Sequence, residues 1–201
     1  GMNLGGGTYL EFVLPGILAL SAMNNSFSPV SASLNISKLY TKTLEEVLVS
    51  PVSPWDIVLG RSLTGLARGL FSALMLLLVG LVSGVHLHLS ISFFVVLSLT
   101  AFCFSAAGVA AAMVTRTHED MANVNSFFIL PMSFLAGTFF SPDKLPEPFH
   151  TAILIYPLTH ASMLLRALAS GNDASPGSMI VLAAYTAIFF FLGGRLVKRT
   201  G

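Results

Sequence analysis

The feature that most constrains this chain is a series of long apolar runs that are almost free of charge. A helix needs about 20 residues to cross the hydrocarbon core of a bilayer. Runs of that length recur along the 201 residues; Arg68 is the only charge inside them, and the first softens through Asn24, Asn25 and Pro29. We therefore predict an all-α polytopic membrane protein with about five transmembrane helices, at residues 12–36, 63–85, 91–114, 122–141 and 178–194.

Composition supports this class and excludes others. Hydrophobic residues make up 54% of the chain, charged residues only 9%, and the mean hydropathy is +0.82. Soluble domains carry about 25% charged residues, so a soluble enzyme or a disordered segment is excluded. The 10 basic residues are nearly balanced by 9 acidic ones, which predicts no nucleic-acid partner. Cys103 is the single cysteine and has no partner for an intrachain disulfide.

The segment between the fourth and fifth predicted spans, residues 142–172, has a different character. It contains four prolines, and the apolar stretches between them are too short to cross a bilayer. We predict an outer re-entrant segment that enters the membrane without crossing it. The alternative is an ordinary long loop, which the apolar composition makes the weaker interpretation.

The basic residues predict the orientation of the chain. Eight of the ten fall on one side of the predicted spans, and only Lys144 and Arg166 fall on the other. Because basic residues favour cytoplasmic loops, we predict that residues 37–61 and the C-terminus are cytoplasmic. Five spans then leave the N-terminus outside, although residues 1–7 show no signal peptide. We therefore expect that a first helix is missing.

Motifs for catalysis or cofactor binding are not evident. No phosphate-binding G-x-x-x-x-G-K-[ST] loop occurs, so we predict that this chain does not hydrolyse ATP itself. His86 and His88 lack a third metal ligand nearby, and Gly80 to Gly84 is not a nucleophile elbow. We predict no catalytic, cofactor-binding or metal residue. Apart from Arg68, which is explained by snorkelling, no buried charge suits an ion-driven carrier.

Small residues recur at helical spacing within the second predicted span. Such residues let helices approach closely in a membrane. The spacing does not separate packing within one bundle from packing between subunits, and both remain open. The predicted helix-packing residues are Gly65, Gly69, Gly80 and Gly84.

The cytoplasmic segment 37–61 is more than a tether between two spans. Pro51 and Pro54 are predicted to interrupt it, and Trp55 suits the headgroup layer. A helix here would either pass force from a soluble partner to two spans or lie on the membrane surface. The residues before Pro51 predict a short amphipathic helix, with Leu39, Leu44, Val47 and Leu48 on one side and Glu45 and Glu46 opposite.

Four stretches in order carry a family resemblance that covers nearly the whole chain. They are residues 9–16, residues 43–53 followed by Leu59-Gly60-Arg61, residues 134–142 followed by Leu145-Pro146, and residues 156–160 followed by Arg166. In this order they resemble the permease subunits of ABC-2 type exporters, the group that includes nodulation-factor, polysaccharide and drug export permeases. That family normally has six spans and a cytoplasmic N-terminus, which agrees with a missing first span.

The resemblance implies a division of labour between subunits. Two permease copies, most simply a homodimer, would form the path, and separate ATP-binding cassette subunits would hold ATP and Mg. The implied ATPase-coupling residues are Thr43, Leu44, Glu45, Glu46, Leu48 and Pro51. The implied outer re-entrant residues are Leu145, Pro146, Pro157, His160 and Arg166.

We therefore expect a permease subunit of an ATP-driven exporter in the cytoplasmic (inner) membrane, in contact with membrane lipid. The cargo is expected to be a large amphiphile, a glycan or glycolipid slightly ahead of a drug, on the likeness of residues 157–160. The alternative from another class is a polytopic membrane scaffold that binds a partner without transport. A membrane-embedded enzyme ranks third because no catalytic set is evident.

Overall fold

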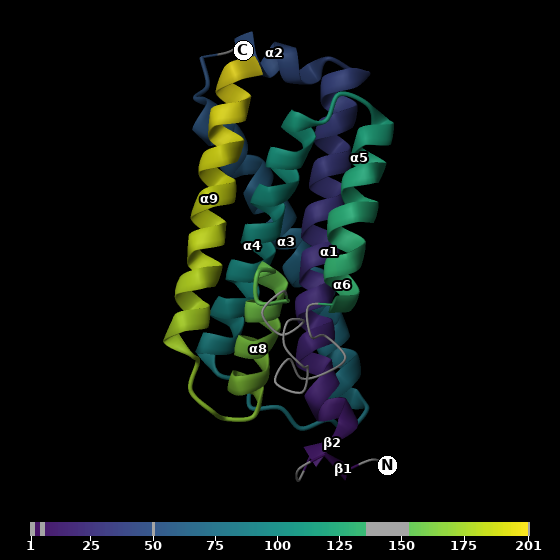
Figure 1. Ribbon diagram of the computed structural model, residues 1–201, viewed down its shortest axis with the longest axis vertical. Coiled ribbons are helices and arrows are strands. Elements are labelled where there is room, and N and C mark those ends of the chain that lie inside the picture. Colours follow the sequence, from purple (N-terminus) through teal and green to yellow (C-terminus); the bar gives the residue numbers. More distant parts are fainter. Residues whose placement is uncertain (1–2, 5–6, 50, 136–152, 201) are drawn as a thin grey trace.

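A computed structural model describes the backbone of residues 3–4, 7–49, 51–135 and 153–200. Its described part is helical, apart from a two-residue antiparallel pair of strands, β1 (Asn3–Leu4) and β2 (Gly7–Thr8). The long helices run side by side along the long axis of the molecule (Figure 1). The predicted all-α class is confirmed.

The helices fall into a long and a short group. Three of the long ones, α3 (Pro54–Val82), α4 (Ile91–Val114) and α9 (Pro176–Thr200), are long and apolar enough to cross a membrane. The fourth long helix is α1 (Tyr9–Leu39). The shorter elements are α2 (Thr43–Val49), α5 (His118–Val124), the π-helix η1 (Asn125–Ile129), α6 (Leu130–Leu135) and α8 (Pro157–Ala169).

Helix α1 contains the first predicted span but is shielded mainly by protein. Its 31 residues extend about 46 Å, and it packs against α3, α4 and α8. Leu18 and Met23 are fully buried, while Asn24 and Asn25 lower its hydropathy below that of the other long helices. A central position explains how a helix with these amides can lie in the bundle, since neighbouring helices replace lipid around it.

Helix α3 begins earlier than the second predicted span, residues 63–85. Pro54 is its first residue, and the hydroxyl of Ser53 accepts a hydrogen bond from the Trp55 N–H (3.3 Å). Proline suits the first turn because its missing N–H is not needed there. Helix α2 ends at Val49, before both prolines, as predicted, and Pro54 then begins a new helix. Segment 37–61 thus includes the end of α1, α2 and the start of α3.

Helix α4 has the bounds predicted for the third span, and α5, η1 and α6 run on from one another where the fourth was predicted. This stretch begins at His118, ahead of residue 122, because Thr117 and Asp120 form a capping box at its start. Residues 136–141, the end of the predicted span 122–141, lie outside the described residues.

Helix α8 is the described part of the predicted outer segment. Its 13 residues extend about 20 Å, too short to cross a core of about 30 Å. It packs against α1, α4 and α9 and buries Leu158 and Leu165 completely. This part is therefore a packed helix, and its entry from the outer face stays a prediction. Leu145 and Pro146 lie outside the described residues.

Glycines bring α3 close to its neighbours. A Cβ on Gly69 would lie 2.8 Å from the carbonyl oxygen of Ala22 in α1, and one on Gly65 or Gly80 would also collide with side chains of the bundle. These three glycines pack within one chain. Gly84 does not: it follows α3 with φ of +84° and has nothing within 4 Å of a Cβ. It has no helix-packing contact within this chain, and its left-handed turn is a conformation that favours glycine.

Candidate functional site

The short helix α2 is anchored to the bundle through Leu44, the buried residue among its described side chains. Leu44 is only 3% exposed and belongs to a buried cluster that includes Leu34 of α1, Val58 of α3 and Val197 of α9. Helix α2 itself has seven residues, too few to be stable alone in water. The contact through Leu44 therefore holds α2 in place. A displacement of α2 would also move α1 and α3, the helices before and after it in the chain.

The predicted amphipathic helix through Leu39 is divided in the structure. Helix α1 ends at Leu39, and α2 begins at Thr43. Between them Lys42 has φ of +53°, a left-handed conformation that interrupts helical hydrogen bonding. Leu39 and Leu44 thus belong to different helices, and Val47 is 38% exposed instead of buried. The single continuous apolar stripe was a wrong prediction.

The outward side of α2 is partly polar and partly apolar. Thr43, Glu46 and Pro51 are exposed, and Val49 is 89% exposed. The side chains of Glu45 and Leu48 lie outside the described part of the chain. A hollow of about 360 Å³ opens between α2 and the start of α3. It is lined by Leu44, Val47, Val52, Asp56, Ile57, Gly60, Arg61 and Thr64.

A second connection, which sequence reasoning did not find, joins the end of α1 to the end of α4. The ammonium of Lys38 donates to the carbonyl oxygens of Met113 and Thr115 (both 2.8 Å) and weakly to that of Ala112 (3.4 Å). The Asn35 amide donates to the Thr115 hydroxyl (3.3 Å). These bonds satisfy carbonyls that a helix end leaves without partners. We call this arrangement the Lys38 clamp.

Trp55 connects α3 to α9. Its ring packs against Gly194 and stacks on Phe190 with centroids 6.0 Å apart. It also meets Phe191 edge to face at 5.7 Å. At 37% exposure the indole is only partly covered. The contact explains its place at the start of α3, and its predicted location among headgroups stays a prediction.

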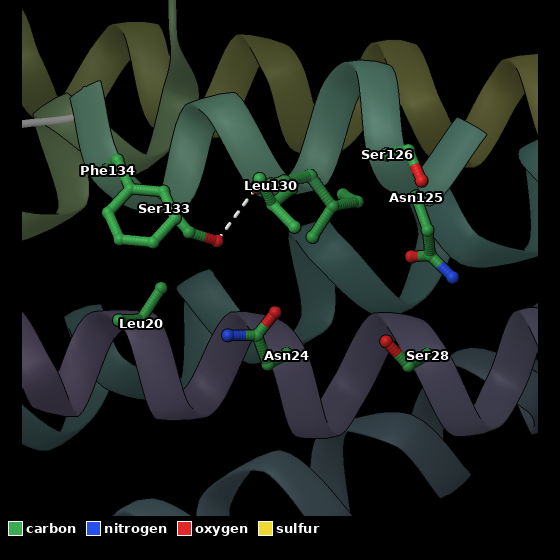
Figure 2. Close-up of a pocket in the computed structure, with 9 residues that line it drawn as sticks. Leu20, Asn24, Ser28, Asn125, Ser126, Leu130, Ser133 and Phe134 are labelled. Atoms are coloured by element: carbon green, nitrogen blue, oxygen red, sulfur yellow. Dashed lines mark hydrogen bonds between the residues drawn. The ribbon is translucent and has the colours of Figure 1, made fainter. Parts of the chain in front are cut away.

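A polar groove lies between α1 and the α5–η1–α6 stretch. Figure 2 shows Asn24 and Ser28 of α1 facing Asn125 and Ser133 across it. The cavity measures about 430 Å³. The Ser133 hydroxyl of α6 donates to the carbonyl of Ile129 at the end of η1 (2.7 Å). Polar side chains within membrane helices are costly and mark functional surfaces, and π-turns such as η1 often accompany them.

At the opposite end of the molecule, predicted outer residues hold α8 in place. The Arg166 guanidinium donates through Nε to the carbonyl of Phe12 (3.1 Å) and lies 4.2 Å from the centre of its ring. Burial lowers the pKa of Arg166 to about 10. His160 reaches the Leu154 carbonyl (2.9 Å) and the Ser178 hydroxyl (3.3 Å). Pro157 is the buried first residue of α8. These contacts are structural.

Metal-binding geometry is not found in the described part of the chain: no group of three or more histidine, cysteine, aspartate or glutamate side chains comes together there. The expectation that this chain binds no metal or cofactor stays a prediction.

Comparison with known proteins identifies the family. Residues 2–170 match the family model described as ABC-2 type transporter. The chain belongs to the ABC-2 type transporter family. It is 27% identical over 200 residues to the inner membrane transport permease YadH of Escherichia coli (strain K12), covering 98% of this chain and 78% of that protein. It is 28% identical to nodulation protein J of Rhizobium leguminosarum bv. trifolii over 201 residues (98% and 76%) and of Rhizobium meliloti (strain 1021) over 213 residues (99% and 78%). No solved structure matches.

The family membership confirms the predicted resemblance and identifies the chain as a transport permease subunit, an integral membrane protein. The ABC-2 permease is a transmembrane component of its transporter. The α2 region and the polar groove are its candidate functional parts.

Proposed function

We propose that this permease is the transmembrane subunit of an ATP-driven exporter that moves a large amphiphile across the cytoplasmic membrane. The observation that carries the proposal is the placement of α2. This helix joins α1 to α3, is anchored through Leu44, and presents exposed Thr43 and Glu46 away from the bundle. An anchored helix between two long ones transmits a displacement as a rigid element.

The proposed partner is an ATP-binding cassette subunit that holds ATP and Mg²⁺. The hollow beside α2 has an apolar side at Val47 and Val52 and an acidic side chain at Asp56. The neighbouring Val49 is almost fully exposed. Exposed apolar side chains rimmed by polar groups are typical of a protein-binding surface. We propose that the ATPase covers this surface and that ATP-driven closure of two such subunits moves α2.

The Lys38 clamp supports a route from α2 into the membrane part. A displacement of α2 pulls on the end of α1, which the clamp joins to the end of α4. Tyr40 stacks on His118 at the start of α5, with ring centres 5.1 Å apart. Helix α5 continues into η1 and α6, which line the polar groove. These contacts connect α2, the proposed ATPase-binding helix, to the polar groove, the proposed cargo surface.

The arrangement of basic residues supports a cytoplasmic C-terminus. Figure 1 shows α2, the α4–α5 connection and the C-terminus at one end of the molecule, and the N-terminus and the end of α8 at the other. Most of the described lysines and arginines lie at the end that carries α2 and the C-terminus. Arg166 lies at the other end. Basic residues favour the cytoplasmic side. Those of the first end are Lys38, Lys42, Arg61, Arg116, Arg195, Lys198 and Arg199.

The polar groove supports an amphiphilic cargo. The amides of Asn24 and Asn125 offer donors and acceptors that match hydroxyl groups, while Leu20, Leu130 and Phe134 supply apolar contact. This mixture favours a glycan or glycolipid over an ion, with a drug as the second choice. A second permease copy would complete the path around the groove.

Co-purification tests the proposal. We expect the tagged permease to retain an ATP-binding cassette subunit from the same genome in detergent. A scramble of residues 43–48 should abolish retention. Glu46→Lys should weaken it, while Asp173→Lys, a matched reversal of an exposed charge on the other end, should not. If the membrane-inserted wild type retains no such subunit, the exporter proposal fails. Retention of a partner without a nucleotide site would favour a scaffold.

A further inference from the structure

We propose that a second concave surface of this permease binds a membrane phospholipid, whose acyl chain occupies it. This lateral groove has α4 as its floor and α9 and the α5–η1–α6 stretch as its walls, with a volume of about 450 Å³. Figure 1 shows these walls on opposite sides of α4. The floor and walls are apolar, with Phe104 and Ala107 from α4, Ile129 and Met132 from η1 and α6, and Phe189 from α9.

The polar atoms near the lateral groove do not call for a polar ligand. Tyr185 is one of two tyrosines in the lining, and its hydroxyl donates to the Ile155 carbonyl (2.6 Å). This bond also joins α9 to the segment that precedes α8. Ile155, Tyr156 and Pro157 close that end of the groove. An occupant therefore enters from the other end or from the side, and it contacts hydrocarbon groups along its length.

The length of the lateral groove matches one leaflet. Its lining extends along α4 from Phe104 to Val114 and along α9 from Tyr185 to Leu192. These stretches cover about 15 Å and about 10 Å at 1.5 Å per residue, and half of the hydrocarbon core measures about 15 Å. The stretch of α4 lies at the C-terminal end of that helix, and the stretch of α9 lies at the middle of α9. The groove thus extends from the end of α4 over a length close to that of one leaflet.

The lining of the lateral groove suits a hydrocarbon chain as its occupant. Almost all of its surface is apolar, and lipid acyl chains are the abundant solvent within the hydrocarbon core. A chain held by the floor and both walls makes more van der Waals contacts than one on a flat surface.

Charged residues at the open end complement a lipid phosphate. Arg199 follows Leu192 by two helical turns on the same side of α9, and Arg195 lies one turn from Leu192. Arg116 follows Val114 at the end of α4. All three arginines are exposed. The acidic residues in the first turn of α5 are Glu119 and Asp120, and Asp120 accepts hydrogen bonds from the backbone N–H groups of Arg116 and Thr117 (2.9 and 3.0 Å). Arginine pairs with phosphate through charge-assisted hydrogen bonds.

Native mass spectrometry of the full chain, purified without any ATPase, tests the site. We expect one phospholipid to stay bound after delipidation in mild detergent. Ala107→Phe, which fills the lateral groove, should abolish the lipid-bound species, whereas Ala187→Phe on an exposed face of α9 should not. Removing the phosphate contacts with Arg195→Gln plus Arg199→Gln should reduce the bound fraction, and Lys198→Gln should leave it unchanged.

The same spectra show the outcomes that overturn the proposal. A wild-type chain that retains no phospholipid, or an Ala107→Phe chain that retains as much as the wild type, excludes the site. A dimer that dissociates on Ala107→Phe would assign the groove to a second copy instead. Because no ATPase is present, failure of the lipid site leaves the exporter proposal untouched, and failure of the exporter proposal does not affect this result.

A fluorescence measurement avoids any groove-filling change. With Trp55 replaced by Phe, a single tryptophan is introduced either at Phe128 in the wall of the groove or at Phe71 on the outside of α3, where the phenylalanines are 65% and 64% exposed. At one brominated phospholipid per protein in detergent, Phe128→Trp should be quenched and Phe71→Trp should not. Equal quenching of both would refute a specific site.

Discussion

The close approach of α1, α3 and α4 at Gly69 permits a quantitative prediction. A Cβ at this position would lie 2.8 Å from the Ala22 carbonyl oxygen, 3.0 Å from Ser26 Cβ and 3.1 Å from Ala101 Cβ. Non-bonded carbon atoms pack without strain at about 3.5–4.0 Å. The methyl group added by Gly69→Ala would therefore overlap atoms of both α1 and α4. Overpacking of this kind costs about 1–3 kcal/mol. Backbone atoms of α1 are among the crowded groups, so a side-chain rotation does not relieve the strain.

The same helix contains a matched control. Gly60 also lies in α3, and nothing is within 4 Å of a Cβ there. Alanine is favoured over glycine in a helix by about 1 kcal/mol, and this gain applies to both positions. We therefore expect Gly60→Ala to be more stable than wild type and Gly69→Ala to be less stable than Gly60→Ala by about 1–3 kcal/mol, the packing cost alone.

Equilibrium unfolding in mixed detergent micelles, followed by circular dichroism, measures this difference. The two variants should have the same helical signal before unfolding, because neither change removes a backbone hydrogen bond. If Gly69→Ala unfolds at the same detergent composition as Gly60→Ala, or at a more denaturing one, α1, α3 and α4 are not in close contact at this point. The reasoning from the glycine geometry would then be refuted.

Three further predictions concern the end of the molecule that carries α2 and the C-terminus. Lys38→Met should lower the free energy of unfolding by about 1–3 kcal/mol because charged hydrogen bonds are lost, and Lys38→Arg should restore much of it in the same assay. Leu44→Ala removes the anchor of α2 and should increase proteolysis between residues 40 and 53, while Val49→Ala, at an exposed position, should not. Asp120 precedes the predicted fourth span, and the pKa of its carboxyl group is lowered mainly by the hydrogen bond from the Arg116 N–H. The ionised carboxylate should therefore stabilise the fold fully above pH about 4, and this stabilisation should be lost as the pH falls through the lowered pKa. Thermal unfolding of the wild type and Asp120→Asn should therefore converge in acid, and a constant difference between them would contradict this.

The sequence alone determined the class of the protein and its family. Uncharged apolar runs predict membrane helices because the cost of burying a charge in lipid acts on each segment separately. The bounds of α4 follow from this local property, with the Ser90 hydroxyl accepting the Phe93 N–H at its start (3.2 Å). The family resemblance was equally readable, since it rests on short motifs in a fixed order and residues 2–170 match as a unit.

The limits of local reasoning appear where a position depends on a distant partner. Gly80 and Gly84 have the same spacing signal, yet one meets Leu14 of α1 and the other occupies a left-handed turn. The proline at position 54 interrupts a helix in one context and begins one in another. Only the cap provided by Ser53 and the contact of the following turn with α9 decide between them.

The candidate sites depend even more on tertiary structure. The Lys38 clamp joins residues about 75 positions apart in the chain, and the lateral groove is built from α4, η1, α6 and α9. No sequence window contains both sides of either arrangement. Hydropathy therefore decides which segments enter the membrane, because each helix meets lipid as a unit. Which of its faces meets a neighbour, a cargo or a lipid chain is decided by packing among helices, since that depends on shapes that come together only in the folded chain.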